Sequence, residues 1–364
     1  SLATIAATMD ERHETAERTE DDLAGLLYTS GTTGRSKGAM ITHGNLASNA
    51  ETLVELWRMS AADRLLHALP IFHVHGLYVA LNTAFLAAAE ITWFSRFDVK
   101  AIIAEMPSAT LMMGVPTFYT RLLSDESFTR EVSANMRLFI SGSAPLLAET
   151  HSAFSARTGH AILERYGMTE TGMITSNPYE GTRVPGTVGF ALPGVEARIR
   201  GEQPGVLEVK GPNVFKGYWR MPEKTREDFT PDGWFVTGDV GTIDEDGRVT
   251  IAGRAKDLII SGGFNVYPKE IEEILDAFPG IGESAVIGVP HRDFGEGVVA
   301  VVTASGPLAP EAEIIAELAR SLAKFKVPKR IFEVAELPRN AMGKVQKAEL
   351  RKRYASAFAD SSAR

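Results

Sequence analysis

Cysteine is absent from the 364 residues of the chain. This absence excludes disulfide frameworks, zinc sites built on thiolates and a cysteine nucleophile. It also fits a reducing compartment, so we expect a cytoplasmic protein. Long hydrophobic runs are missing as well, because the most apolar stretch, residues 77–89, carries Asn82 and Thr83 and is too short to cross a bilayer. We therefore expect no membrane partner.

An excess of positive charge is also lacking. The chain has 38 Lys and Arg against 46 Asp and Glu, a formal net charge of −8, which argues against a protein that coats nucleic acid. Hydrophobic residues make up 44% and charged residues 23%, as in a globular protein rather than a disordered or collagen-like chain. The length favours two or three domains, each large enough to bury its own core.

Short apolar runs alternate with longer amphipathic stretches between residue 22 and about residue 183. This alternation predicts an α/β fold in which a parallel sheet carries helices on both faces, with ligands at the loops beyond the strand ends. The predicted strands are residues 24–30, 65–70, 91–94, 110–114, 138–142 and 162–167. The predicted helices are residues 45–57, 77–89, 116–123 and 146–157.

The pattern changes twice further along the chain. Residues 187–252 show short strands separated by Gly, Pro and Asp turns, which predicts a small antiparallel or barrel-like β subdomain. A separate α+β pattern follows. We therefore expect a large domain at 1–252, a boundary at 253–257 and a smaller C-terminal α+β domain at 258–364.

A loop rich in glycine and hydroxyl side chains, YTSGTTGRSKG, occupies residues 28–38 between a predicted strand and a predicted helix. Its glycines let backbone N–H groups turn inward to hold an anion, and Lys37 adds a positive charge. These features suit polyphosphate, although the spacing does not match the P-loop of the usual NTPases and composition alone also allows a simple turn. The candidate ATP-binding residues here are Thr29, Ser30, Gly31, Thr32, Thr33, Gly34 and Lys37.

The loop resembles the signature of the acyl-adenylate-forming enzymes, which include acyl-CoA synthetases, adenylation domains and luciferases. Four further segments resemble those of the family, in the family's order. They are YGMTET at 166–171, TGD at 237–239, GRAKD at 253–257 running into SGG at 261–263, and PRNAMGK at 338–344. The resemblance implies ATP and coenzyme A as substrates, Mg²⁺ as the metal ion and a carboxylic acid as the group that is activated.

The resemblance also implies roles for individual residues. Joining a carboxylate to the α-phosphate of ATP requires cations on the phosphates and no side-chain nucleophile. Glu170 would hold Mg²⁺, which prefers one or two carboxylates plus phosphate oxygens, and Thr29 would share that ion. Lys344 would neutralise the negative charge that develops in the first half-reaction. Lys256 occupies the hinge position about which the small domain would turn between the two half-reactions.

A second group of residues would bind the nucleotide. By resemblance, Asp239 would accept hydrogen bonds from the ribose hydroxyls, Arg254 would meet the ribose or the α-phosphate, and Tyr166 would stack on adenine. The segments around the adenine and the phosphates supply the remaining candidates. These are Ser143, Ala144, Glu164, Arg165, Gly167, Met168 and Thr169.

The small domain would bind coenzyme A. Ser261, Gly262 and Gly263 form a loop whose glycines suit the close approach of a pantetheine arm. Residues 324–353 are strongly basic, but an interleaved aromatic platform of the RNA-binding kind is not evident, so we expect coenzyme A phosphates and no nucleic acid. The candidates in this stretch are Lys324, Lys326, Lys329 and Arg330.

Polar residues stand where most acyl-CoA synthetases have an apolar acyl pocket. The segments that carry these polar residues resemble those of malonyl-CoA synthetases, so malonate is the expected acid. The expected acyl-binding residues are His73, His75, Arg121, Ser141, Ser143 and Met168. Arg121 would bind the distal carboxylate of malonate bidentately. In the alternative, Arg121 is an exposed helix residue paired with Asp125.

Three questions stay open at the level of sequence. The acid is either malonate or another short acid such as methylmalonate. Family members carry a further segment before the phosphate loop, whereas this chain has 27 residues before that loop, so the first part of the large domain is expected to be missing. A truncated chain that binds nucleotide without catalysis is therefore the alternative to an active ligase, and the oligomeric state is unknown.

Overall fold

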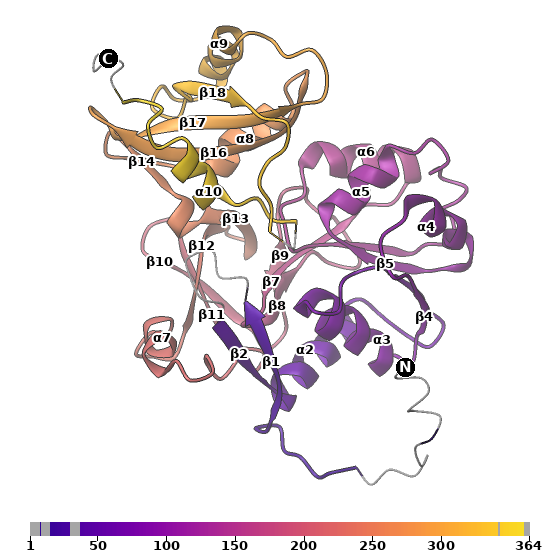
Figure 1. Ribbon diagram of the computed structural model, residues 1–364. Coiled ribbons are helices and arrows are strands. Elements are labelled where there is room, and N and C mark those ends of the chain that lie inside the picture. The colour runs from indigo at the N-terminus through magenta and orange to yellow at the C-terminus, as the bar shows by residue number, and fades with distance from the viewer. Residues whose placement is uncertain (1–7, 9–14, 30–36, 341–342, 360–364) are drawn as a thin grey trace.

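The computed structural model describes residues 8, 15–29, 37–340 and 343–359, and it has a larger and a smaller domain (Figure 1). The larger domain opens with two antiparallel strands, β1 (Leu23–Thr29) and β2 (Lys37–Thr42). The predicted phosphate-loop residues Ser30, Gly31, Thr32, Thr33 and Gly34 fall between these strands, outside the described residues. The prediction that the loop runs from a strand into a helix was wrong, because β2 pairs with β1 and the first helix begins after β2.

An eleven-stranded sheet forms the body of the larger domain, and five of its strands pair in parallel in the order β7-β6-β5-β3-β4. This part confirms the predicted parallel sheet. The five strands are β3 (Arg64–His67), β4 (Glu90–Trp93), β5 (Leu111–Gly114), β6 (Leu138–Ser141) and β7 (Leu163–Met168). Helix α2 (His43–Leu56) precedes these strands, and the helices between them are η1 (His75–Leu81), α3 (Asn82–Leu86), α4 (Val99–Glu105), η2 (Met106–Ser108), α5 (Pro116–Leu123) and α6 (Ala148–Thr158).

The remaining strands of this sheet are antiparallel, as predicted. They confirm the antiparallel alternative for the β subdomain at 187–252, and they join the parallel strands through the β7–β8 pair. The strands are β8 (Gly172–Ser176), β9 (Gly189–Ala191), β10 (Glu196–Arg200), β11 (Gly205–Lys210), β12 (Phe235–Ile243) and β13 (Arg248–Arg254). The helical segments of this part are α7 (Pro222–Glu227) and η3 (Ala255–Asp257).

The smaller domain has a five-stranded sheet with helices packed on it. Its strands are β14 (Ile259–Ser261), β15 (Phe264–Val266), β16 (Ile281–His291), β17 (Gly295–Ala304) and β18 (Arg330–Glu333). Its helices are α8 (Pro268–Asp276), α9 (Glu311–Ser321) and α10 (Lys347–Arg353). The chain crosses from one sheet to the other at η3, inside the segment 253–257 that the sequence singles out.

Both faces of the central parallel strands β5 and β6 are buried, which explains their unbroken apolar runs. Successive residues of a strand point to opposite faces. Leu111 and Met113 therefore pack on the α2 side, whereas Met112 and Phe139 pack under α4, α5 and α6. The segments LMMG of β5 and LFIS of β6 are buried at every position.

Local signals fix where the helices begin. Thr42 caps α2, since its hydroxyl accepts the Asn45 N–H at 3.1 Å while the Asn45 side chain accepts the Thr42 N–H at 3.0 Å. The Asp98 carboxylate accepts the Ala101 N–H at 3.0 Å and starts α4. Pro116 occupies the first turn of α5, where its missing N–H costs nothing.

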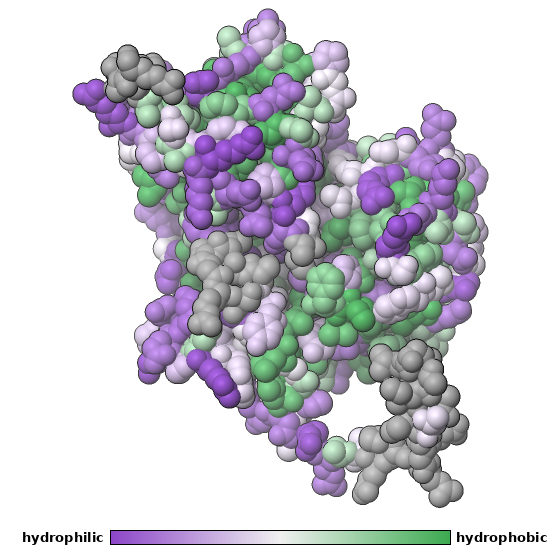
Figure 2. All heavy atoms as spheres, in the orientation of Figure 1, coloured by the Kyte–Doolittle hydropathy of each residue, from purple (hydrophilic) through white to green (hydrophobic). Residues whose placement is uncertain are grey.

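Several large apolar side chains of the larger domain lie at the surface. Figure 2 shows apolar residues gathered in the middle of one face, where β1 and the η1–α3 segment lie in Figure 1. The exposed residues of these elements and their neighbours are Leu23, Leu26, Tyr28, Ile71, Phe72, Phe85, Leu86 and Trp93. Among the helices that the structure describes, none is long and apolar enough to cross a membrane.

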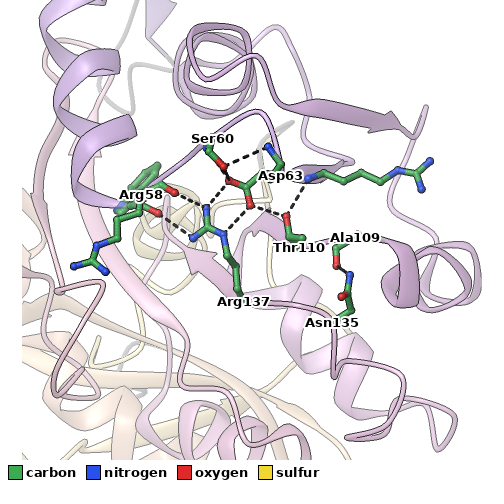
Figure 3. A network of polar contacts seen from close by, with 10 residues as sticks. Arg58, Ser60, Asp63, Ala109, Thr110, Asn135 and Arg137 are labelled. Atoms are coloured by element: carbon green, nitrogen blue, oxygen red, sulfur yellow. Dashed lines mark hydrogen bonds and ion pairs between the residues drawn. The ribbon is translucent and has the colours of Figure 1, made fainter.

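A network around Asp63 ties together the loops before β3, β5 and β6 (Figure 3). Arg137 donates from Nε and Nη2 to the two Asp63 carboxylate oxygens at 2.7 Å each, and Thr110 and Ser60 donate to the same oxygens at 2.8 Å. Burial alone would raise the pKa of Asp63, but these hydrogen bonds outweigh it and lower the pKa. The ionised carboxylate therefore stabilises the fold.

We expect Asp63→Asn to lower the free energy of unfolding at pH 7 by roughly 3 kcal/mol, because Arg137 keeps its charge and loses its carboxylate partner. The difference between wild type and variant should be constant above the ordinary Asp pKa of about 3.9. It should shrink as the pH falls through the depressed pKa of Asp63, since the wild-type group then takes up a proton in both states. Urea unfolding at a series of pH values measures this difference.

Glu180→Gln is the matched control for this variant. Glu180 also pairs with an arginine, Arg58, at 2.5 Å, but both side chains are more than half exposed. Loss of this exposed ion pair should lower the free energy of unfolding by less than about 1 kcal/mol. An equal loss of stability in the two variants would contradict the role assigned to the buried network.

Candidate functional site

Asp239 and Arg254 form an ion pair on the hairpin of β12 and β13. They stand opposite each other in the strand register, and Arg254 Nε lies 2.7 Å from Asp239 Oδ1. The Tyr166 hydroxyl on β7 donates to the other carboxylate oxygen, and Thr237 Oγ1 accepts the Asp239 N–H at 3.0 Å. Burial raises the pKa of Asp239, although Arg254 opposes this rise. The structure thus brings three predicted nucleotide-binding residues into direct contact.

Glu170 lies in the turn between β7 and β8 and is only 6% exposed. The Tyr218 hydroxyl donates to Glu170 Oε1 at 2.9 Å, and Phe215 N–H donates to the Glu170 backbone carbonyl at 2.8 Å. One carboxylate oxygen is therefore anchored by Tyr218. Thr169 and Glu170 line a small cavity between this turn and α2.

Lys37 approaches Glu170 through Tyr218, and Thr29 is the register partner of Lys37. The two residues lie at the ends of β1 and β2, and Lys37 Nζ lies 4.0 Å from the centre of the Tyr218 ring. The Thr29 hydroxyl oxygen is buried and finds no hydrogen-bond partner among the described residues. One carboxylate plus an unused hydroxyl fits Mg²⁺, which keeps water and phosphate oxygens as its other ligands. The described residues hold no group of three or more His, Asp or Glu that could bind a metal alone.

Lys344 reaches this site from the smaller domain. Figure 1 shows the segment between β18 and α10 running down to the larger sheet near β7 and β9. Gly343 takes a left-handed conformation, φ 74°, and the Asn340 side chain accepts the Lys344 N–H at 3.0 Å. Crowding by protein and the charge of Arg254 lower the pKa of the Lys344 ammonium, whereas Asp239 and Glu170 raise it.

A polar wall lies beside Lys344. The His75 ring Nδ1 is 3.2 Å from Ser143 Oγ, and the His73 ring Nδ1 accepts the His75 N–H at 3.3 Å. Burial lowers the pKa of His73 to about 4 and the pKa of His75 well below its ordinary value, so both rings are neutral at pH 7. Ser143 holds φ at 71°, a conformation that non-glycine residues adopt at a cost, as is frequent at functional sites.

Two models of known protein families match the chain. A family model described as "AMP-binding enzyme" matches residues 2–219, and one described as "AMP-binding enzyme C-terminal domain" matches residues 270–344. The chain belongs to the AMP-binding enzyme family. The resemblance to acyl-adenylate-forming enzymes is thereby confirmed.

Relatives of this AMP-binding enzyme include malonate–CoA ligases. One of Arabidopsis thaliana is 39% identical over 94% of this chain and 62% of its own length, and a mitochondrial one of Mus musculus is 41% identical over 90% of this chain and 64% of its own length. The chain thus spans less than two thirds of the length of these relatives.

A solved structure resembles this AMP-binding enzyme more closely. ATP-bound MatB from Rhodopseudomonas palustris is 59% identical, with a TM-score of 0.95 over 98% of this chain and 73% of that chain. The apo structure of the same protein gives a TM-score of 0.80 at the same identity and coverage. In its arrangement this chain is therefore more similar to the ATP-bound structure than to the apo structure.

Two nucleotide candidates of the AMP-binding enzyme point away from the Asp239 ion pair. Glu164 is buried on β7, and its carboxylate accepts the Gly186 N–H at 3.1 Å. The charges that act on it are those of Lys269 and Glu273 on α8. Arg165, the next residue, packs its guanidinium against Gly142 beside the histidine wall, rather than forming an adenine wall.

The other predicted residues of this segment occupy varied positions. Gly167 sits so close to the Gly172 carbonyl across the β7–β8 hairpin that a Cβ would overlap it. Met168 is half-buried against the core under β2, and Ser141 is buried at the end of β6. Ala144 is exposed in the loop before α6.

Arg121 does not join the histidine wall through any contact of the described residues. It is exposed in the last turn of α5, and its guanidinium carbon lies 5.1 Å from the centre of the Phe97 ring. The alternative, an ion pair with Asp125, does not form among the described residues either, because Asp125 accepts from the Ser127 N–H and hydroxyl.

The coenzyme A candidates lie on the smaller domain and are not a uniform basic surface. Lys326 Nζ is 2.7 Å from both Glu270 carboxylate oxygens, and Arg330 pairs with Glu311 at 3.2 Å, whereas Lys324 is exposed. Lys329 Nζ lies 4.0 Å from the centre of the Phe294 ring. Two of the four candidates, Lys326 and Arg330, are therefore paired with acids from outside the 324–353 stretch.

The glycine loop and the hinge residue stand apart from that stretch. Gly262 and Gly263 form the β14–β15 turn with φ of 60° and 84°, and Ser261 is buried. Lys256 is exposed in η3, where burial of its surroundings lowers the pKa of its ammonium and Asp257 raises it.

Sequence reasoning missed Tyr218 and Thr237. Tyr218 anchors Glu170 and underlies Lys37, and Thr237 holds the backbone of Asp239. Thr237 was inside the recognised TGD segment and could have been singled out as a short-range acceptor for the Asp239 N–H. Tyr218 carries no local signal, because its position depends on a long-range bridge to Ala39.

We expect the pH dependence of stability to report on Glu164. Burial raises the pKa of this carboxyl from 4.5 to about 7. Its contribution to stability is therefore complete below pH 4.5 and lost as the pH rises through 7. Glu164→Gln, which keeps an acceptor for Gly186, should be roughly 1–3 kcal/mol more stable than wild type at pH 8 and equal to it near pH 4. Thermal unfolding across this range measures the difference, and the exposed Glu149→Gln should show none.

Proposed function

We propose that this AMP-binding enzyme ligates malonate to coenzyme A. Malonate would first attack the α-phosphate of ATP, forming malonyl-adenylate and releasing pyrophosphate. The thiol of coenzyme A would then attack the adenylate carbonyl, forming the thioester and releasing AMP. The observation that carries this proposal is that Lys344, from the smaller domain, lies close enough to Glu170, Asp239 and Arg254 of the larger domain for their charges to act on its ammonium. The similarity to malonate–CoA ligases and to MatB supports the choice of acid.

In the first half-reaction the enzyme positions charges rather than supplying a nucleophile. Asp239 accepts the ribose hydroxyls while Arg254 holds it in place, and the Tyr166 ring flanks the base. Glu170 and Thr29 would hold Mg²⁺, which supplies positive charge to the phosphate oxygens. The negative charges of Asp239 and Glu170 favour the Lys344 ammonium. This ammonium would neutralise the charge that develops at the α-phosphate.

In the second half-reaction the smaller domain turns about Lys256 and presents the Ser261–Gly263 loop. The higher TM-score to ATP-bound MatB than to its apo form supports the view that the domain arrangement described here belongs to the first half-reaction. The left-handed Gly262 and Gly263 leave room for a thin pantetheine arm at the loop tip. Lys324 and Lys326 are candidates for the coenzyme A phosphates, although Lys326 would have to leave Glu270.

Methylmalonate is the second candidate acid. A malonyl-CoA ligase whose product complex contains methylmalonyl-CoA and AMP is 39% identical to this chain, with a TM-score of 0.65. Cytoplasmic location stays a prediction from composition, since the mouse relative is mitochondrial.

Pyrophosphate release with malonate, methylmalonate, acetate and a long-chain acid tests the proposed function. We expect release with malonate to exceed release with acetate by at least tenfold, with methylmalonate intermediate. If nucleotide binds but no acid releases pyrophosphate, the chain is a nucleotide-binding protein and the proposed ligase activity is wrong.

We expect Lys344→Ala to reduce adenylate formation by at least about 100-fold, the effect of removing one charge-stabilising donor. Thioester formation from supplied malonyl-adenylate should change less than about threefold, because Lys344 would act only in the first arrangement of the domains. Single-turnover assays of each half-reaction measure the two effects. Lys352→Ala, an exposed lysine on α10, is the control and should alter neither. Equal loss in both half-reactions would contradict the domain rotation.

A further inference from the structure

The Lys344 ammonium takes its position from the backbone turn that carries it. In the part of the chain that the structure describes, this ammonium forms no hydrogen bond or ion pair, and the charges of Arg254, Asp239 and Glu170 act on it from the larger domain. An ammonium on a flexible four-carbon stem reaches a fixed point only if its backbone is held. The contacts that hold the turn therefore decide where the charge lies.

The turn is a small hairpin whose base is rooted in the smaller domain. Arg339 and Val345 pair as an antiparallel bridge, and the Gln346 N–H donates to the Pro338 carbonyl at 2.7 Å. Leu337, just before the hairpin, is buried in the core between β16, β17 and α10, and Val345 packs against the same core. The base of the hairpin is thus packed, and the residues beyond it need another support.

Arg339 supplies that support with both arms of its guanidinium. Its Nη1 donates to the Gly343 carbonyl, next to Lys344, at 2.5 Å, and its Nη2 donates to Glu283 Oε1 at 2.6 Å. Glu283 belongs to β16, so the guanidinium joins the far end of the hairpin directly to the sheet of the smaller domain. A planar fork of this kind fixes both the distance and the direction of the groups that it joins.

Glu283 stands at a β-bulge. The pairing of β16 with β17 shifts register between Ile281 and Glu283, because Gly282 is an extra residue on β16. Bulges re-aim side chains and are frequent next to active sites. Thr303, the register partner of Glu283, also holds its backbone, since Thr303 Oγ1 accepts the Glu283 N–H at 3.0 Å. The acid that receives the guanidinium is therefore itself fixed, at an irregular point of the sheet.

We propose that Arg339 is a positioning residue for Lys344 in adenylate formation, and that Glu283 holds Arg339 in place. This inference rests on the proposed function, in which Lys344 acts on the α-phosphate. Arg339 acts through Lys344, by fixing the Gly343 carbonyl and thereby the point that the next side chain reaches. The placement matters because an error of about 1 Å in a reacting group can reduce a rate by about 100-fold.

The test compares Arg339→Met with wild type in each half-reaction. We expect kcat for adenylate formation to fall by at least about tenfold and KM for ATP to change less than about threefold, because Lys344 acts on the transition state. Thioester formation from supplied malonyl-adenylate should stay close to wild type. Arg339→Lys keeps the charge for Glu283 and loses the fork, so its kcat should lie between those of Arg339→Met and wild type.

Two variants separate positioning from stability. Lys347→Met removes a second ion pair of the same segment, with Glu272 of α8 at 2.6 Å, and this pair is less exposed than that of Arg339. It should lower the unfolding temperature at least as much as Arg339→Met and leave adenylate formation close to wild type. Arg320→Met, which loses an exposed ion pair within α9, should match wild type in both. An equal loss of adenylate formation in Lys347→Met and Arg339→Met would overturn the assignment.

A double-mutant cycle tests whether Arg339 acts through Lys344. In a Lys344→Ala background, Arg339→Met should reduce adenylate formation no further, because the group that it positions is gone. The same factor of loss in both backgrounds would show that Arg339 acts by another route.

The ionisation of Lys344 separates this inference from the ligase activity itself. The surrounding protein and the charge of Arg254 lower the pKa of the Lys344 ammonium. Reductive methylation with an isotopic label lets NMR follow this pKa, with the signal assigned by its loss in Lys344→Ala. In Arg339→Met the pKa should rise toward the ordinary lysine value of about 10.4. Equal pKa values in wild type and Arg339→Met would contradict the positioning role, whereas a wild type that releases no pyrophosphate would contradict only the proposed function.

Discussion

The ion pair between Asp239 and Arg254 is the contact on which the rest of the site depends. It fixes β12 against β13, it gives the Tyr166 hydroxyl its acceptor, and its charges act on Lys344. Arg254 is also the last residue before η3, so the pair anchors the chain where it leaves the larger sheet. At the end of η3 the chain is attached to the smaller domain instead, because Asp257 pairs with Arg351 of α10 at 2.7 Å. If the domains rotate as proposed, the two residues between these ion pairs, one of which is Lys256, are the place where the backbone is free to turn.

The hydrogen bonds and the ion pair around Lys344 attach it to the smaller domain. These hydrogen bonds run within residues 339–345, and Arg339 is tied to Glu283 of β16 at 2.6 Å. The described contacts of Lys344 with the larger domain are electrostatic. Under the proposed rotation, a charge attached to the smaller domain would therefore be present beside the larger domain in one arrangement and removed in the next.

Features that depend on local interactions could be predicted from the sequence, whereas features that depend on contacts between distant residues could not. The parallel strands and α5 were predictable, because apolar runs and Pro116 are local signals, and the recognised segments named Glu170, Asp239 and Lys344. The partner of β1 was not predictable, since β1 is as apolar as the core strands yet pairs only with β2. The distribution of charge in residues 324–353 also depends on distant partners: Glu270 and Glu311 neutralise Lys326 and Arg330 from other elements.

Neighbouring residues of strand β7 lie in different surroundings, so their roles could not be assigned from the sequence segment that they share. Successive side chains of a strand point to opposite faces. Glu164 and Tyr166 therefore share one face, where they contact Gly186 and Asp239, whereas Arg165 lies on the other face against Gly142 and the histidine wall. Burial makes a carboxylate costly at the first position and a guanidinium costly at the second, so the strand carries charges that a fold selected for stability alone would not keep. The carboxylate lies toward the smaller domain and the guanidinium toward the cleft of Lys344. A cost of this kind persists where a ligand or a moving domain offsets it.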